Sequence, residues 1–214
     1  MRIGILGSGR VGQALGKKLV EIGHEVMLGT RDPEKLKDWK SQVGENGHTG
    51  SLSEAATFGE ILFSAFPGSA TLNALAQAGE ANLNGKVLID VSNSLIRSEG
   101  KPTTMFVSNT DSVAEQIQRA YPQVKVVKTL NTLGVGVMVN PRQLADGDHD
   151  IFISGNDAEA KAQVVQLLTG EFGWRRVTDL GDITTARGAE MYMMLWIRLL
   201  ATFGTPVFNI KIVR

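Results

Sequence analysis

The sequence contains no cysteine, and it carries no excess of charge of either sign. The lack of cysteine excludes disulfides, thiolate metal sites, cysteine nucleophiles and iron–sulfur clusters. The 22 basic residues equal the 22 acidic residues in number, so no field of one sign attracts nucleic acid or an anionic membrane surface. We therefore expect neither nucleic acid nor a membrane as a partner. Because the chain has no cysteine, any redox function must use a bound cofactor.

Long hydrophobic runs are also missing. The longest apolar tract, 191–203, is interrupted by Arg198 and is shorter than the roughly 18 to 20 residues that a membrane span needs. The first residues show no charged segment followed by a long apolar stretch, which predicts a cytoplasmic protein without a signal peptide. The aspartates of 146–150 do not have the spacing of a calcium loop, and we expect no bound metal.

Short apolar runs alternate with helical patterns along the whole chain. This alternation predicts an α/β protein with a doubly wound, mainly parallel sheet of the Rossmann type. Two polar stretches, 43–50 and 97–104, are expected to be surface loops. The expected strands are 2–6, 25–29, 61–66, 87–91, 124–130, 150–154 and 175–179.

The segment 186–203 has a helical pattern that is apolar nearly all round. Such a helix must be buried, either in its own core or against another subunit, and a dimer interface is favoured over a wall for a flavin. We therefore expect a Rossmann domain over 1–181. A short C-terminal helix and tail over 182–214 would pack on this domain or at a homodimer interface.

A glycine-rich turn lies between the first strand and the first helix. Gly7-Ser8-Gly9-Arg10-Val11-Gly12 matches the pattern G-x-G-x-x-G in the context that a dinucleotide-binding unit requires. Gly7 permits the tight turn, Gly9 lets the backbone approach a pyrophosphate, and Gly12 lets the helix pack on the strand. The free amides and the helix dipole then favour the anion.

The end of the second strand predicts which dinucleotide is bound. A protein selective for NAD presents an acidic residue there, whereas this chain presents Thr30 and Arg31. A hydroxyl and a guanidinium suit a 2′-phosphate, and Lys35 could add charge one helical turn later. NADP is therefore the expected cofactor. The alternative is that Arg31 only pairs with Asp32 or Glu34.

Three further strand ends should line the same edge of the sheet. The segment 65–67, Ala-Phe-Pro, offers small and apolar groups that can pack against a flat ring. Asn93 and Asn131 follow two other strands and can orient a carboxamide or carbonyl without titrating, although asparagine also favours turns. A ligand contact and a turn are equally supported for each asparagine.

No catalytic acid or base stands out. Neither tyrosine has a lysine four residues later, and the three histidines lie before the second strand (His24), in a polar loop (His48) and among the aspartates of 146–150 (His149). Reduction of a ketone needs a proton donor, whereas hydride transfer between two ring cofactors mainly needs their orientation. The sequence thus favours hydride exchange between NADP(H) and a deazaflavin or flavin. A sensor that binds NADP(H) and acts through a protein partner, without chemistry, fits equally well.

Six segments together resemble the family of NADP oxidoreductases that depend on coenzyme F420, a deazaflavin, and more distantly the cytosolic reductase domain of the STEAP metalloreductases. The resemblance covers nearly the whole chain. The segments are Ile3 to Gly12, Gly29-Thr30-Arg31, Gly85 to Asn93, Val127 to Thr132, Ile153 to Asp157 and Phe203 to Lys211.

The resemblance implies roles for particular residues. Ser8, Arg10 and Val11 would hold the pyrophosphate and adenosine, and Thr30 and Arg31 the 2′-phosphate. The residues expected to flank the nicotinamide are Ala65, Phe66 and Pro67, with Asn131 and Gly134 near the second ring. Asn131 is a departure, because deazaflavin enzymes can carry histidine there, so a free flavin or a small electrophile could take that place.

Overall fold

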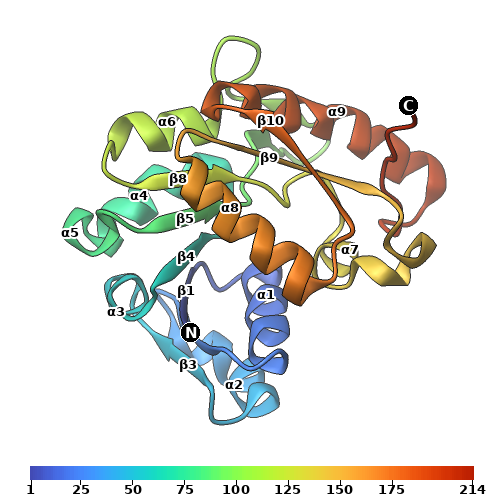
Figure 1. Cartoon of the computed structure of the whole chain (residues 1–214). Coiled ribbons are helices and arrows are strands. Elements are labelled where there is room, and N and C mark those ends of the chain that lie inside the picture. Colours follow the sequence, from blue (N-terminus) through green and yellow to red (C-terminus); the bar gives the residue numbers. More distant parts are fainter.

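The central strands are buried on both faces, as their continuous apolar sequences require. The computed structural model describes residues 1–214 and contains an eight-stranded sheet covered by helices (Figure 1). The strand order is β10-β9-β8-β5-β4-β1-β2-β3, and only the β8–β9 pair is antiparallel. The strands are β1 (Arg2–Leu6), β2 (Glu25–Gly29), β3 (Gly47–Gly50), β4 (Ile61–Ser64), β5 (Val87–Asp90), β8 (Lys125–Lys128), β9 (Asp150–Gly155) and β10 (Arg176–Gly181). This is the predicted doubly wound, mainly parallel architecture.

Helices cover both faces of the sheet (Figure 1). One core of 26 buried residues includes side chains from α1, α2, α7 and α8, and a second core of 18 includes side chains from α3 to α6 and the start of α9. The helices are α1 (Arg10–Glu21), α2 (Lys37–Val43), α3 (Leu52–Phe58), α4 (Gly68–Ala78), α5 (Glu80–Leu83), α6 (Val113–Ala120), α7 (Val135–Val139), α8 (Ala158–Gln166) and α9 (Ala186–Phe203). None of them combines the length and the hydrophobicity needed to cross a lipid bilayer.

The strand order reverses beside β1. The chain runs from β1 outward through β2 and β3, and then returns to place β4 on the other side of β1. In sheets of this kind, a crevice opens where the order reverses, at the carboxyl ends of the strands. The turns that follow β1 and β4 therefore face the same crevice.

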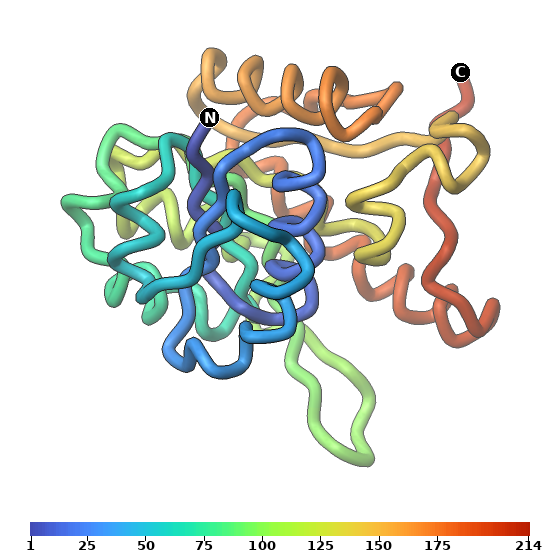
Figure 2. The backbone as a smooth tube through the Cα atoms, turned by 90° about the horizontal axis from the view of Figure 1, so that it is seen from below, coloured from blue at the N-terminus to red at the C-terminus, as the bar shows by residue number.

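The predicted loops needed correction. Residues 47–50 form β3, which pairs in parallel with β2, so 43–50 is not a loop throughout. The sequence Gly-His-Thr-Gly does not alternate apolar and polar residues. The strand is held at the sheet edge by backbone hydrogen bonds, which leave no pattern of side chains in the sequence. Thr104 belongs to a small hairpin made of β6 (Leu95–Ile96) and β7 (Thr104–Met105), while 97–103 forms its connecting loop. Figure 2 shows this hairpin protruding from the body.

Helix α9 has the bounds that its apolar pattern predicted, and the chain beyond it lies against the sheet. We call residues 205–214 the tail. Asp150 at the start of β9 donates its backbone amide to the Ile210 carbonyl at 3.0 Å, and its carboxylate accepts the Ile212 amide at 2.7 Å. The tail has no regular secondary structure, but these hydrogen bonds fix it to the start of β9 (Figure 2).

A buried ion cluster joins α9 to the sheet. Lys128, the last residue of β8, places its Nζ 2.8 Å from Asp90 Oδ2 and 2.9 Å from Glu190 Oε1, and all three side chains are at most 2% exposed. Glu190 also accepts the backbone amides of Val113 and Ala114 at the start of α6. Burial disfavours the charge, but Asp90 and Glu190 outweigh it and raise the pKa of Lys128 above its ordinary value.

Replacing Lys128 should destabilise the fold strongly. Lys128→Met leaves two buried carboxylates without their cation, which should lower the free energy of unfolding by about 3–5 kcal/mol. Lys125→Met is the matched control, because Lys125 lies on the same strand and pairs with Asp157 in a partly exposed ion pair at 3.0 Å. Its loss should cost less than about 1 kcal/mol. Urea denaturation measures both variants, and equal losses would contradict the account.

Candidate functional site

The turn from β1 into α1 has no room for side chains. Gly7 has φ +123°, and a Cβ there would lie 2.7 Å from the Ala65 carbonyl oxygen. A Cβ on Gly12 would lie 2.0 Å from the Gly7 carbonyl oxygen. Glycine at these two positions lets α1 begin directly beside the end of β1, as the motif predicts.

The first turn of α1 leaves its amides free for an anion. No side chain caps the helix, and its first turn contains no acidic residue. Gly9 stands at the N-cap, and no atom lies within 4 Å of the place where its Cβ would be. The backbone amides and the helix dipole together favour a negative group at this opening.

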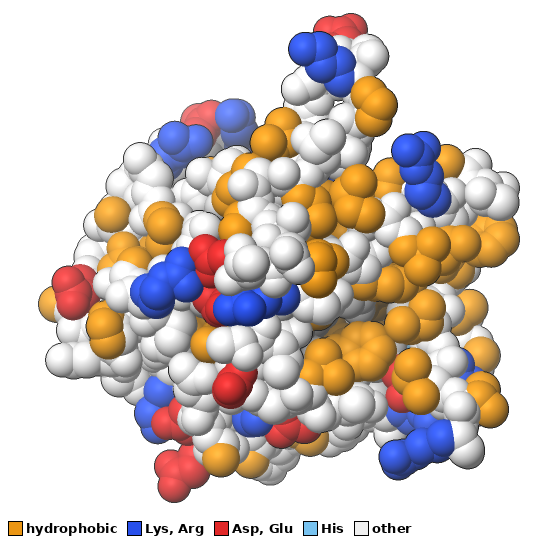
Figure 3. Space-filling model, turned by 90° about the horizontal axis from the view of Figure 1, so that it is seen from above, with side chains coloured by type: hydrophobic (Ala, Val, Ile, Leu, Met, Phe, Trp, Pro, Cys, Tyr) orange, Lys and Arg blue, Asp and Glu red, His pale blue; other side chains and the backbone are white.

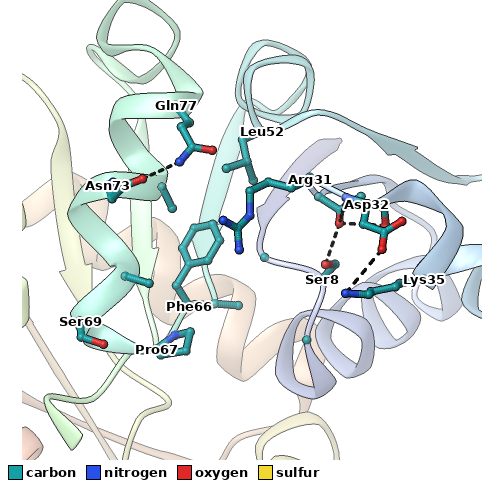
Figure 4. A pocket seen from close by; sticks show the side chains of 17 residues that line it. Ser8, Arg31, Asp32, Lys35, Leu52, Phe66, Pro67, Ser69, Asn73 and Gln77 are labelled. Atoms are coloured by element: carbon teal, nitrogen blue, oxygen red, sulfur yellow. Dashed lines mark hydrogen bonds and ion pairs between the residues drawn. The ribbon is translucent and has the colours of Figure 1, made fainter. Parts of the chain in front are cut away.

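The end of β2 adds a hydroxyl pair and a free guanidinium. Ser8 Oγ donates to Thr30 Oγ1 at 2.9 Å, and the Asp32 amide donates to the same oxygen at 3.0 Å. Arg31 forms no ion pair, because Asp32 pairs with Lys35 at 3.5 Å and Glu34 pairs with Lys37. The alternative role predicted for Arg31, as a partner of Asp32 or Glu34, is therefore not observed. Its side chain points into the cavity toward Phe66 (Figure 4).

A cavity of about 760 Å³ lies over these groups. Nine of the fifteen predicted cofactor-binding residues line it, namely Gly7, Ser8, Gly9, Thr30, Arg31, Lys35, Ala65, Phe66 and Pro67. Sequence reasoning missed the wall formed by α4, where Ser69, Asn73 and Gln77 recur every four residues (Figure 4). This spacing places the three polar side chains on one helical face, a signal that was present in the sequence. Asp32 and Leu52 also line the cavity.

The other six predicted residues lie outside the cavity lining. Arg10 and Val11 occupy the first turn of α1, and Gly12 is buried against Gly7. Asn93, Asn131 and Gly134 follow β5 and β8, farther along the same edge of the sheet. The predicted set thus falls into two groups, one around the phosphate turn and one at the neighbouring strand ends.

Asn93 and Asn131 are bonded to each other. Asn93 Nδ2 donates to the Asn131 backbone carbonyl at 2.9 Å, and Asn131 Nδ2 donates to Asn93 Oδ1 at 2.9 Å. Asn131 Nδ2 donates also to the Ala189 carbonyl of α9 at 3.1 Å. The side chain of Asn93 is therefore used as donor and acceptor within the chain, whereas Asn131 Oδ1 accepts no hydrogen bond from the chain.

The segment 131–134 runs on into an aromatic region beside the tail. A Cβ on Gly134 would lie 2.6 Å from the Pro206 carbonyl oxygen, so the tail rests on this glycine. Trp196 of α9 stacks on Phe208 with ring centroids 5.3 Å apart. Thr132 Oγ1 and Trp196 Nε1 are buried without a hydrogen-bond partner. The region therefore combines flat apolar groups with two unused polar atoms.

The cavity lining holds only three titratable side chains, those of Arg31, Asp32 and Lys35. The three histidines have partners elsewhere. His24 contacts Glu171 at 2.5 Å, His48 packs on the Phe58 ring, and His149 contacts the Pro141 carbonyl oxygen at 2.9 Å. This arrangement suits anion binding and the orientation of a ring rather than proton transfer by a side chain.

The aspartates of the segment 146–150 all pair with basic side chains. Asp146 pairs with Arg175 at 2.9 Å, Asp148 with Lys211, and Asp150 with Arg176 at 3.2 Å. Ion pairing with arginine and lysine therefore accounts for these carboxylates.

The chain is similar to several known proteins. The model of the family "NADP oxidoreductase coenzyme F420-dependent" matches residues 2–94. A protein from Arthrobacter sp. FB24, whose crystal structure is described provisionally as that of an F420-dependent NADP reductase, is 47% identical in sequence to this chain. The match covers 100% of both chains, with a TM-score of 0.95. The F420-dependent NADP reductase of Methanocaldococcus jannaschii is 28% identical over 99% of this chain and 98% of its own. The metalloreductase STEAP3 of Rattus norvegicus is 28% identical over 96% of this chain and 38% of its own.

Gly9 offers a test that separates ligand binding from folding. Gly9→Ala should change the stability by less than about 1 kcal/mol, because the added methyl group meets open space. The same group would hold a pyrophosphate away from the amides, so the dissociation constant for NADPH should rise at least about tenfold, or 1.4 kcal/mol. Gly170→Ala is the control, since Gly170 is also unobstructed but lies outside the cavity lining. Equal NADPH affinities of the two variants by calorimetry would refute the placement.

Proposed function

Because the chain belongs to the family of coenzyme F420-dependent NADP oxidoreductases, and is thus an NAD(P)-dependent oxidoreductase, we propose that it exchanges hydride between NADP(H) and a deazaflavin or flavin. The observation that carries this proposal is the cavity in which the uncapped start of α1 and the unpaired Arg31 meet. Both groups are positive, and they lie where the sheet order reverses.

The phosphate turn and β2 would hold the adenosine half of the cofactor. The amides of Ser8 to Val11 would bind the pyrophosphate, as the open position of Gly9 supports. Thr30 and Arg31 would bind the 2′-phosphate, with Lys35 adding charge at the cavity rim. The Asp32 carboxylate would repel this phosphate, but the ion pair between Asp32 and Lys35 offsets part of the repulsion.

The end of β4, which lines the cavity, and the strand ends beyond it would hold the two rings. Ala65, Phe66 and Pro67 would flank the nicotinamide, and Asn131 Oδ1 would accept a hydrogen bond from a carboxamide or ring N–H. When bound, NADPH supplies a hydride from its nicotinamide ring. The role of this chain is then to align two flat rings at reacting distance and to exclude water.

The second ring would lie near Asn131 and Gly134, next to the aromatic region. Phe208 is half-buried, stacks on the buried Trp196 and offers flat apolar surface, and Asn131 Oδ1 is an unused hydrogen-bond acceptor. A deazaflavin or flavin presents a flat ring with polar edges, which suits this combination. The absence of an acid–base pair from the cavity lining supports ring-to-ring transfer over reduction of a ketone.

The phosphate preference can be tested at Arg31. Arg31→Glu should weaken NADPH binding by roughly 1.5–3 kcal/mol through the lost charge-assisted contact, with repulsion adding to the loss. NADH binding should become favoured over NADPH binding. Lys17→Glu changes the net charge equally but lies outside the cavity lining, so it should leave both affinities unchanged. Calorimetry measures the affinity of each variant for NADPH and for NADH. Unchanged affinities in Arg31→Glu would mean that the 2′-phosphate binds elsewhere.

The acceptor can be tested by stopped-flow mixing. NADPH-loaded protein is mixed with oxidised coenzyme F420 and, separately, with FMN, and the loss of NADPH absorbance is followed. We expect rapid oxidation with at least one of them. If neither accepts hydride although calorimetry detects tight NADPH binding, the proposed reaction is wrong and a role as an NADP(H) sensor is favoured instead.

A further inference from the structure

A second hollow opens beside the cavity, at the ends of β2 and β3. We call this hollow of about 630 Å³ the side groove. Thr30, Arg31, Leu52 and Gln77 line both hollows, so the side groove continues directly from the cavity. Most of its lining is polar, unlike the surface over α9 and the tail, where Figure 3 shows hydrophobic side chains gathered.

The place of the side groove along the dinucleotide follows from the proposed function, on which this inference rests. With the pyrophosphate at the start of α1 and the 2′-phosphate at Arg31, the adenosine ribose lies at the end of β2. The nicotinamide half leads the other way, toward Ala65 to Pro67. The side groove begins at Thr30 and Arg31, and it is therefore the space that the adenine base can enter.

The wall that α4 contributes to the cavity suits a flat base. Ala70, Ala74 and Gln77 lie on one face of this helix, because residues three and four positions apart are neighbours. The two alanines are small and apolar, and Leu52 at the start of α3 adds apolar surface to the same lining. The faces of an adenine ring can pack on such a surface, which leaves the polar edge of the ring for Gln77.

The amide of Gln77 presents its oxygen to this space. Gln77 Nε2 donates to Asn73 Oδ1 at 2.5 Å, which holds the amide nitrogen along the helix. Oε1 accepts no hydrogen bond from the chain and points away from Asn73, toward the side of Leu52 (Figure 4). Glu54 adds a carboxylate to the side groove, and hydrogen bonding to Ser51 lowers the pKa of that carboxyl, so it is charged at neutral pH.

We propose that the side groove selects adenine over other bases through Gln77, whose Oε1 accepts a hydrogen bond from the exocyclic amino group of the base. Adenine carries a donor at this position, whereas hypoxanthine carries a carbonyl oxygen, which Gln77 Oε1 and the Glu54 carboxylate repel. Gln77 is thus a specificity-determining residue, and Asn73 is a positioning residue that fixes its amide. Arg31 stands where the two hollows meet and keeps its role toward the 2′-phosphate.

Calorimetry with NADPH and with reduced nicotinamide hypoxanthine dinucleotide phosphate measures this selection, because the two ligands differ only in the base. We expect the natural chain to bind NADPH at least about tenfold more tightly. Gln77→Met removes the amide and keeps the length of the side chain, so this ratio should fall at least about threefold, through weaker NADPH binding. Gln163→Met is the matched control, since Gln163 is also exposed on a helix but lies outside both hollows, and it should keep the ratio of the natural chain.

Two results would overturn this inference while the proposed binding of NADPH stands. One is equal affinity of the natural chain for the two dinucleotides. The other is an unchanged ratio in Gln77→Met, with circular dichroism showing that the variant is folded. A natural chain that binds neither dinucleotide would overturn the proposed function as well, so the two failures are distinguished by whether NADPH binds at all.

Discussion

The close approach of α1 to the end of β1 is the constraint on which the rest of the candidate site depends. Gly7 and Gly12 leave no Cβ between the turn and the helix, so the first amides of α1 open into the crevice beside β4. Every other group is arranged around that opening. Thr30 and Arg31 reach it from β2, and Phe66 reaches it from the turn after β4. A larger residue at Gly12 would push the helix away and separate these groups.

The buried ion cluster provides a second constraint, on the other half of the site. Lys128 joins the ends of β5 and β8 to α9 through Asp90 and Glu190, and Asn131 adds a hydrogen bond to Ala189. Buried ion pairs do not by themselves stabilise a fold more than apolar packing would. Their effect here is one of position, because they fix the start of α9 over the strand ends, and α9 then carries Trp196 toward the tail.

Local patterns could be predicted from the sequence, and long-range pairings could not. The turn from Gly7 to Gly12 and the helix 186–203 have strong signals within their own residues, and both were confirmed. β3 was missed because it is held by backbone pairing with β2 rather than by an apolar pattern. Asp90 and its buried partner Lys128 lie 38 residues apart, and nothing in either local sequence indicates the pair. The polar face of α4 had a signal at four-residue spacing that was not recognised.

A crystal structure of the chain with NADPH would show where the dinucleotide binds. We expect the pyrophosphate at the amides of Ser8 to Val11 and the 2′-phosphate within hydrogen-bond distance of Thr30 and Arg31, inside the 760 Å³ cavity. The nicotinamide should lie beside Ala65 to Pro67. An empty crevice at saturating NADPH, or a dinucleotide bound elsewhere on the chain, would contradict the account.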